Sequence, residues 1–155
     1  MKDKEIYEFP QAKIYMDLED EMPLLGYEPV ESSEDAIKVV AESMAALDRE
    51  AFYVINRNLL CQPINYSVVS IGGIADVSVY VANVFKSAIL SNAVDVVVIH
   101  NHPSGNLAPS QYDIKLTKRL IKAGKAIGIE VADHIIVAGR SAEYVSLKET
   151  TLLFN

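Results

Sequence analysis

The chain of 155 residues is long enough for one ordinary domain and leaves little room for a second. Half of its residues are hydrophobic and 23% are charged, which excludes the composition of intrinsically disordered proteins. Its net charge of -7 argues against direct binding to a nucleic-acid backbone, and the single cysteine, Cys61, excludes an intrachain disulfide.

No targeting or membrane segment is recognisable in the sequence. The first residues lack the apolar stretch of a signal peptide, and no later apolar run reaches the roughly 18 residues of a membrane span. A lone cysteine is typical of a reducing compartment. We therefore expect a cytoplasmic protein without a membrane-spanning helix. The densest basic stretch, residues 115–125, has helical spacing and indicates a solvated helix face.

The first half of the chain predicts an arm, a helix and a hairpin. Three prolines interrupt residues 1–30, which predicts an extended arm with at most one strand. A capping serine and an acidic first turn then precede helical periodicity over residues 33–47. Two runs rich in β-branched and aromatic residues, 52–55 and 64–71, predict a hairpin with its turn at residues 56–58.

The second half predicts alternating helices and buried strands. The apolar run over residues 94–99 is typical of a strand buried on both faces. Two prolines and Gly105 predict a loop over residues 101–109. The other expected elements are a helix over 81–90, a helix over 110–127 that Gly128 closes, and strands over 131–137 and 144–147.

His100 and His102 follow the buried strand. Residues two apart in an extended segment project to the same side, so both imidazoles can reach one ion at about 2.0 to 2.1 Å. Asp113 is the candidate third ligand, because the loop folds the first turn of the next helix back toward the histidines. These ligands leave a fourth position open for water, as in catalytic zinc sites. The spacing therefore predicts a zinc centre with a catalytic role.

Each of these residues is common when it stands alone. Ordinary loop histidines, a capping serine and an acidic first-turn residue would explain them without a metal. Their combination at this spacing, after a buried strand, favours the metal centre. Iron or cobalt would fit the same nitrogen and oxygen ligands, and zinc is preferred on ligand type.

The pattern His-x-His, seven residues, Ser, two residues, Asp resembles the motif of the JAB/MPN (JAMM) metalloprotease-like domains. The narrower similarity, over about residues 33–148, is to the RadC-like branch. It is carried by residues 100–105, 109–110, Asp113, 128–131 and 133–137. The resemblance implies an α/β fold with a central mixed β-sheet flanked by helices, as one JAB/MPN-like (cytidine deaminase-like) domain. We place this domain at residues 31–155, after the arm at 1–30.

The resemblance also implies catalytic roles for two residues. In similar proteins a glutamate at the start of a core strand acts through the zinc-bound water, and Glu50 is the matching position. It would take a proton from the attacking water and pass it to the leaving amine. The alternative for Glu50 is an exposed strand-end carboxylate, with Glu42 as the fallback base. Ser110 has two roles open: helix N-cap, and hydroxyl donor to the oxygen that becomes negative.

The roles of two further residues are left open, and the chain departs from the family pattern at one place. His134, inside an apolar strand, is more simply a satisfied core residue than a support for a metal ligand. Asp133 either orients a ligand histidine or caps the strand end. RadC-like chains carry Pro-Arg-Glu where this chain has Val81-Ala82-Asn83. If the triplet serves substrate or partner binding, the specificity of this chain should differ, whereas zinc binding should not depend on the triplet.

These observations favour a zinc-dependent hydrolase of amide or isopeptide bonds that acts on a peptide or protein substrate. A DNA-repair or mobile-element accessory protein of the RadC type is the second hypothesis, and the net charge argues against direct DNA contact. The third is a metal-binding interaction module without catalysis, which the intact ligand set disfavours. Pairing of two copies through the exposed sheet edge, as a homodimer, is left open.

Overall fold

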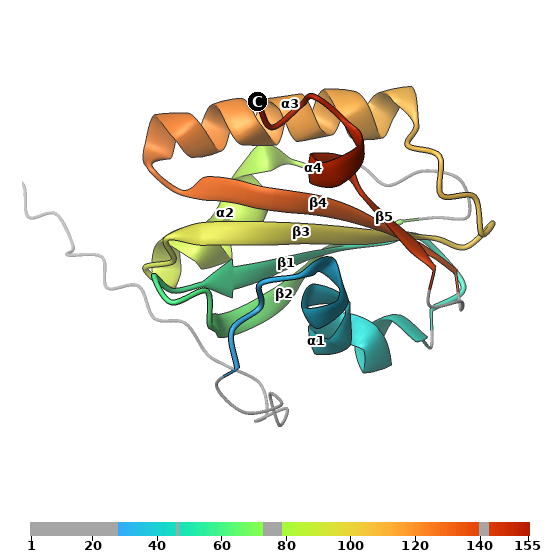
Figure 1. Ribbon diagram of the computed structural model, residues 1–155, viewed down its shortest axis with the longest axis horizontal. Helices are drawn as coiled ribbons and strands as arrows, with labels where there is room; N and C mark the ends of the chain where they lie inside the picture. Colours follow the sequence, from blue (N-terminus) through green and yellow to red (C-terminus); the bar gives the residue numbers. More distant parts are fainter. Residues whose placement is uncertain (1–27, 46, 73–78, 140–142) are drawn as a thin grey trace, which may run out of the picture.

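The described part of the chain forms a five-stranded β-sheet with helices on both faces (Figure 1). It comprises residues 28–45, 47–72, 79–139 and 143–155 of a computed structural model, so nearly all of the arm predicted over 1–30 lies outside it. The division of the chain at residue 30 stays a prediction. The elements are α1 (Ser33–Ala45), β1 (Ala51–Arg57), β2 (Pro63–Ile71), α2 (Val81–Leu90), β3 (Asp95–His102), α3 (Gln111–Ile127), β4 (Glu130–Ala138), β5 (Tyr144–Ser146) and α4 (Leu147–Thr150).

The sheet is mixed, and its strand order is β2-β1-β3-β4-β5. β1 pairs antiparallel with both β2 and β3, β3 pairs parallel with β4, and β4 pairs antiparallel with β5. A parallel pair needs a crossover connection, and α3 supplies it between β3 and β4. The predicted α/β class, with a central mixed sheet flanked by helices, is confirmed.

Strands β1 and β3 are buried on both faces, which explains the continuous apolar runs at residues 51–55 and 96–99 within them. Successive side chains of a strand point to opposite faces of the sheet. Helices α2 and α3 cover one face and α1 covers the other. The α2/α3 face buries Phe52, Val54, Val96 and Val98, and the α1 face buries Tyr53, Ile55, Val97 and Ile99.

Helix α3 lies along the sheet with one apolar side against it. Its buried positions include Leu116, Leu120 and Gly124, whereas its lysines are exposed, which confirms the solvated face predicted for residues 115–125. The helix ends at Gly128, whose φ of 76° lies in the left-handed region that favours glycine. Among the described residues, no helix combines the length and the apolar character that a membrane crossing requires.

The turn of the hairpin lies later than predicted. Asn56 and Arg57 belong to β1, and the turn follows at residues 58–62. Each polar side chain has a long-range partner: Asn56 Nδ2 donates to Asn65 Oδ1 at 2.6 Å, and Arg57 forms an ion pair with Asp95 at 2.6 Å. The prediction of a turn at 56–58 was wrong because long-range partners of this kind leave no local signal.

Candidate metal centre

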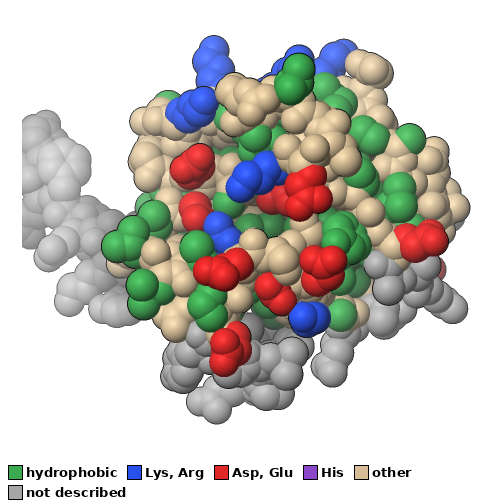
Figure 2. Space-filling model, in the orientation of Figure 1, with side chains coloured by type: hydrophobic (Ala, Val, Ile, Leu, Met, Phe, Trp, Pro, Cys, Tyr) green, Lys and Arg blue, Asp and Glu red, His purple; other side chains and the backbone are tan. Residues whose placement is uncertain are grey.

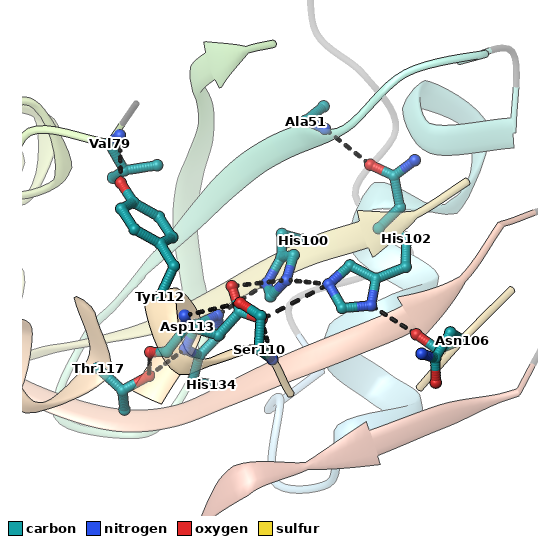
Figure 3. A network of polar contacts seen from close by, with 11 residues as sticks. Ala51, Val79, His100, His102, Asn106, Ser110, Tyr112, Asp113, Thr117 and His134 are labelled. Atoms are coloured by element: carbon teal, nitrogen blue, oxygen red, sulfur yellow. Dashed lines mark hydrogen bonds and ion pairs between the residues drawn. The ribbon is translucent and has the colours of Figure 1, made fainter. Parts of the chain in front are cut away.

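Three side chains meet where β3 ends and α3 begins. His100 and His102 project from β3 toward the α2/α3 face, and Asp113 reaches them from the first turn of α3 (Figure 3). Their side chains are 6%, 11% and 9% exposed, respectively. The structure therefore brings together the three residues that the sequence proposed as metal ligands, in a buried group that can hold a metal ion.

The spacing of the ligand atoms fits one divalent ion. The two Nε2 atoms of His100 and His102 are 2.9 Å apart, and each lies 3.5 or 3.6 Å from an oxygen of Asp113. Ligand atoms about 2.0 to 2.1 Å from a tetrahedral ion are about 3.3 Å from one another. Two imidazole nitrogens and one carboxylate also leave a coordination position open.

The backbone of the loop orients His102. Its Nδ1 lies 2.5 Å from the carbonyl oxygen of Asn106, which can only accept a hydrogen bond. Nδ1 therefore carries the proton, and Nε2 presents its lone pair to the centre. A hydrogen bond from the second ring nitrogen of a ligand histidine to a carbonyl is a common arrangement in metal sites.

Asp113 is fixed by the start of its own helix. Ser110 caps α3: its hydroxyl accepts from the Asp113 N–H at 3.1 Å, and its own N–H donates to Asp113 Oδ2 at 2.7 Å. Burial alone would raise the pKa of Asp113, but the neighbouring imidazoles of His102 and His100 and the hydrogen bonds from Ser110 hold it well below its usual range. The carboxylate is thus ionised and aimed at the histidines.

The pKa values of the two histidines shift in opposite directions. Burial lowers the pKa of His100 to about 4, against the opposing charge of Asp113. The nearby carboxylate of Asp113, 3.6 Å from His102 Nε2, raises the pKa of His102, against the opposing effect of burial. His100 is consequently neutral at pH 7 and ready to act as a ligand, because a metal binds only the unprotonated imidazole nitrogen.

A cavity of about 300 Å³ opens over the three ligands. Phe52 forms part of its wall and stacks on His100, with ring centroids 5.9 Å apart. Tyr112 and Val79 form another part, joined by a hydrogen bond of 3.0 Å from the Val79 N–H to the Tyr112 hydroxyl (Figure 3). Glu50 and Ser110 also line this cavity, so both proposed catalytic residues face the same space as the ligands.

Glu50 is held in place from both sides by Asn101. The regular pairing of β1 with β3 stops at Phe52, and the Asn101 amide continues it: Oδ1 accepts from the Ala51 N–H at 2.8 Å and Nδ2 donates to the Arg49 carbonyl at 3.0 Å. Glu50 is half-buried, unlike the exposed alternative considered for it. Glu42, the fallback base, belongs to α1, but its side chain lies outside the described part of the structure.

Ser110 can combine the two roles proposed for it. As the N-cap, its oxygen accepts a hydrogen bond through a lone pair, which leaves the hydroxyl proton free to donate elsewhere. The side chain is exposed to the cavity and not enclosed by the helix. Capping therefore does not exclude donation to a substrate oxygen.

His134 contacts the ligand candidate His100, whereas Asp133 lies on the other face of the sheet. His134 Nε2 is 2.9 Å from His100 Nδ1, within a fully buried contact, whereas Asp133 accepts from Ser146 at 2.8 Å on the opposite face of the sheet. A bulge in β4 determines which face each side chain occupies. Val131 pairs with Val96 and Asp133 pairs with Val97, so β4 has one extra residue between these pairs, and the residues after it point to the opposite face from the one that regular alternation would give. The suggestion that Asp133 orients a ligand histidine was wrong.

A mixed sheet with a buried His-His-Asp group at the end of a central strand is consistent with a JAB-type domain. The model of the RadC-like JAB domain matches residues 30–152. A UPF0758 protein of Caldanaerobacter subterraneus is 41% identical over 121 residues, which are 77% of this chain and 51% of that protein. A UPF0758 protein of Geobacillus is 42% identical over 120 residues, or 77% of this chain and 52% of that protein.

The chain belongs to the family of RadC-like JAB domains. This confirms the resemblance drawn from the sequence. The chain spans about half the length of the curated relatives that it matches. The family is thereby established, together with a buried His-His-Asp group that can hold a metal ion. Metal binding itself, the reaction and the substrate are matters for proposal.

Proposed function

We propose that this protein is a zinc-dependent hydrolase that cleaves amide or isopeptide bonds of a peptide or protein. One observation carries the proposal: a carboxylate, a hydroxyl and the three metal ligands line the same cavity. Zinc prefers the ligand types present, and when bound it would supply a Lewis acid that lowers the pKa of water and polarises a carbonyl. The positions of Glu50 and Ser110 in the cavity indicate their catalytic roles.

Glu50 acts as the general base and then as the general acid. It accepts the proton of the attacking water molecule and hands it to the amine nitrogen that leaves, a role worth roughly 10²- to 10⁴-fold in rate. Its negative charge contributes to the raised pKa of His102, which is consistent with a carboxylate close to the ligands. The two hydrogen bonds from the Asn101 side chain, here called the Asn101 clamp, fix the backbone on both sides of Glu50. Glu50 therefore loses little conformational entropy when it accepts the proton.

Ser110 donates its free hydroxyl proton to the carbonyl oxygen as that oxygen becomes negative. Its oxygen is already anchored by the Asp113 N–H, which restricts the rotamer and directs the proton away from the helix. The start of α2, where RadC-like chains carry Pro-Arg-Glu and this chain has residues 81–83, lies just after the cavity-lining Val79. We place a determinant of substrate choice at this rim.

The test combines metal content with cleavage. Wild type, Asp113→Asn and Glu50→Gln are loaded with zinc, measured for bound metal, and incubated with a random peptide library read by mass spectrometry. We expect about one zinc in wild type and in Glu50→Gln, none in Asp113→Asn, and cleavage by wild type but by neither of these two variants. The control Glu149→Gln should bind zinc and cleave as wild type does, because Glu149 lies on α4 and does not line the cavity. Equal cleavage by wild type and Glu50→Gln, or no zinc in wild type, would refute the proposal.

The charge distribution disfavours direct contact with DNA. Acidic side chains gather around α1 on the face shown in Figure 2, and the whole chain carries a net charge of -7. A gel-shift titration at low salt should show no binding tighter than the weak nonspecific range of about 10⁻⁴ to 10⁻⁶ M. Tight, salt-sensitive binding would instead favour the DNA-repair hypothesis.

A further inference from the structure

We propose that His134 and Thr117 form a buried relay that decides which nitrogen of His100 carries the proton, and so keeps His100 ready to bind metal. His134 is then a positioning residue of the metal centre, and Thr117 controls it from one step further away. The inference rests on the metal centre proposed above. It adds two residues that touch neither the cavity nor the metal position.

The relay is a continuous chain of four polar groups (Figure 3). The Thr117 hydroxyl lies 2.6 Å from the carbonyl oxygen of Asp113 and 2.6 Å from His134 Nδ1. His134 Nε2 lies 2.9 Å from His100 Nδ1. Thr117 and His134 are both 0% exposed, so no solvent can replace a missing partner.

The direction of each hydrogen bond follows from the one fixed acceptor. A carbonyl oxygen can only accept, so the single proton of the Thr117 hydroxyl points at Asp113. The Thr117 oxygen must then accept from His134, which places a proton on His134 Nδ1. In neutral His134 this leaves Nε2 as an acceptor, and His100 Nδ1 is the group that donates to it. His100 Nε2 is consequently a bare lone pair, directed at His102 and Asp113.

The opposite tautomer of His134 would prevent His100 from binding a metal. If His134 carried its proton on Nε2, His100 Nδ1 would have to accept, and the proton of neutral His100 would sit on the nitrogen that faces the metal position. Ligand histidines usually donate to a carboxylate or a carbonyl, as His102 does. Here the acceptor is another imidazole, which could adopt either tautomer, and the Thr117 hydroxyl selects the useful one. A neutral acceptor also adds no negative charge to the centre.

The test uses Thr117, whose replacement by valine keeps the shape and removes the hydroxyl. We expect Thr117→Val to weaken zinc binding roughly 10- to 100-fold, the usual range for residues that support a ligand, and Thr117→Ser to restore it. Affinity is measured by competition with a chromophoric chelator at one fixed pH. Ser146→Ala removes another buried hydroxyl, bound to Asp133 on the far face, and should leave the affinity unchanged.

A second measurement reads the tautomers directly in the metal-free protein. In ¹⁵N spectra of the imidazole rings, wild type should show the proton on Nδ1 of both His100 and His134, and Thr117→Val should show His134 partly or wholly protonated on Nε2. A wild-type His134 protonated on Nε2, or unchanged zinc affinity in a folded Thr117→Val, would overturn the relay. Failure of the wild type to bind zinc would instead refute the proposed function, since the tautomers are observed without metal.

Discussion

Acidification should destabilise the metal-free protein through the buried histidines of its candidate metal centre. The chain contains three histidines in all, and all three belong to this cluster. Between pH 7.5 and 5.0 histidines dominate the titration of a protein, because most carboxyl groups titrate at lower pH. The pH dependence of the free energy of unfolding in this window therefore reports on the centre itself.

The sign and size follow from His100, whose folded pKa is about 4 and whose unfolded pKa is 6.5. A pKa lowered by folding gives stability that is present above pH 6.5 and lost as the pH falls toward 4, because only the unfolded state takes up the proton. At pH 5.0 this amounts to roughly 2 kcal/mol. Burial also lowers the pKa of His134, which acts in the same direction, whereas the raised pKa of His102 acts in the opposite one.

Urea unfolding of chelator-treated protein at pH 7.5 and 5.0 measures the effect. We expect the free energy of unfolding to fall by about 2 kcal/mol or more. His100→Leu should flatten this pH dependence and His102→Leu should steepen it, because the two residues contribute with opposite sign. A metal-free protein that is equally or more stable at pH 5.0 would refute the reasoning.

Three further substitutions test individual contacts. Asn101→Leu removes the clamp beside Glu50, so the Ala51 amide should exchange with solvent at least about tenfold faster by NMR, whereas Asn101→Asp keeps the acceptor and most of the protection. Ser110→Ala removes the N-cap of α3 and should lower the stability of the metal-free protein by about 1 kcal/mol in urea; no loss would contradict the capping role. Gly124→Ala would place a methyl group 2.4 Å from the backbone oxygen of Ile129, and we expect a loss of about 1 to 3 kcal/mol in thermal unfolding, although alanine favours helices.

Local patterns in the sequence were sufficient to predict the elements that form the centre. The apolar run before His100, the i, i+2 spacing to His102 and the capping serine of α3 are short-range signals, and each has the predicted structural counterpart. The α4 helix was missed because it has a single turn, capped by Ser146. Such a short element offers too little periodicity to be recognised.

The surroundings of the ligands depend on long-range features that the sequence does not display. The extra residue in β4 moves Asp133 to one face and His134 to the other, and a regular alternation from Val131 would have predicted the reverse. The clamp by Asn101 is equally hidden, since its partners are about 50 residues away. An Asn between two histidines gives no local indication that it completes the pairing of a distant strand.

Because Asp113 and His102 lie on either side of a loop, a bound metal ion would link the two ends of that loop. A metal ion held by His102 and Asp113 acts as a cross-link across the exposed connection between β3 and α3, much as a disulfide would. Such a link reduces the chain entropy of the unfolded state, and it ties the two sides of the connection together even if the backbone between them is cut. A proteolytic nick within residues 103–109 should therefore leave the metal-loaded protein assembled and let the metal-free protein fall apart.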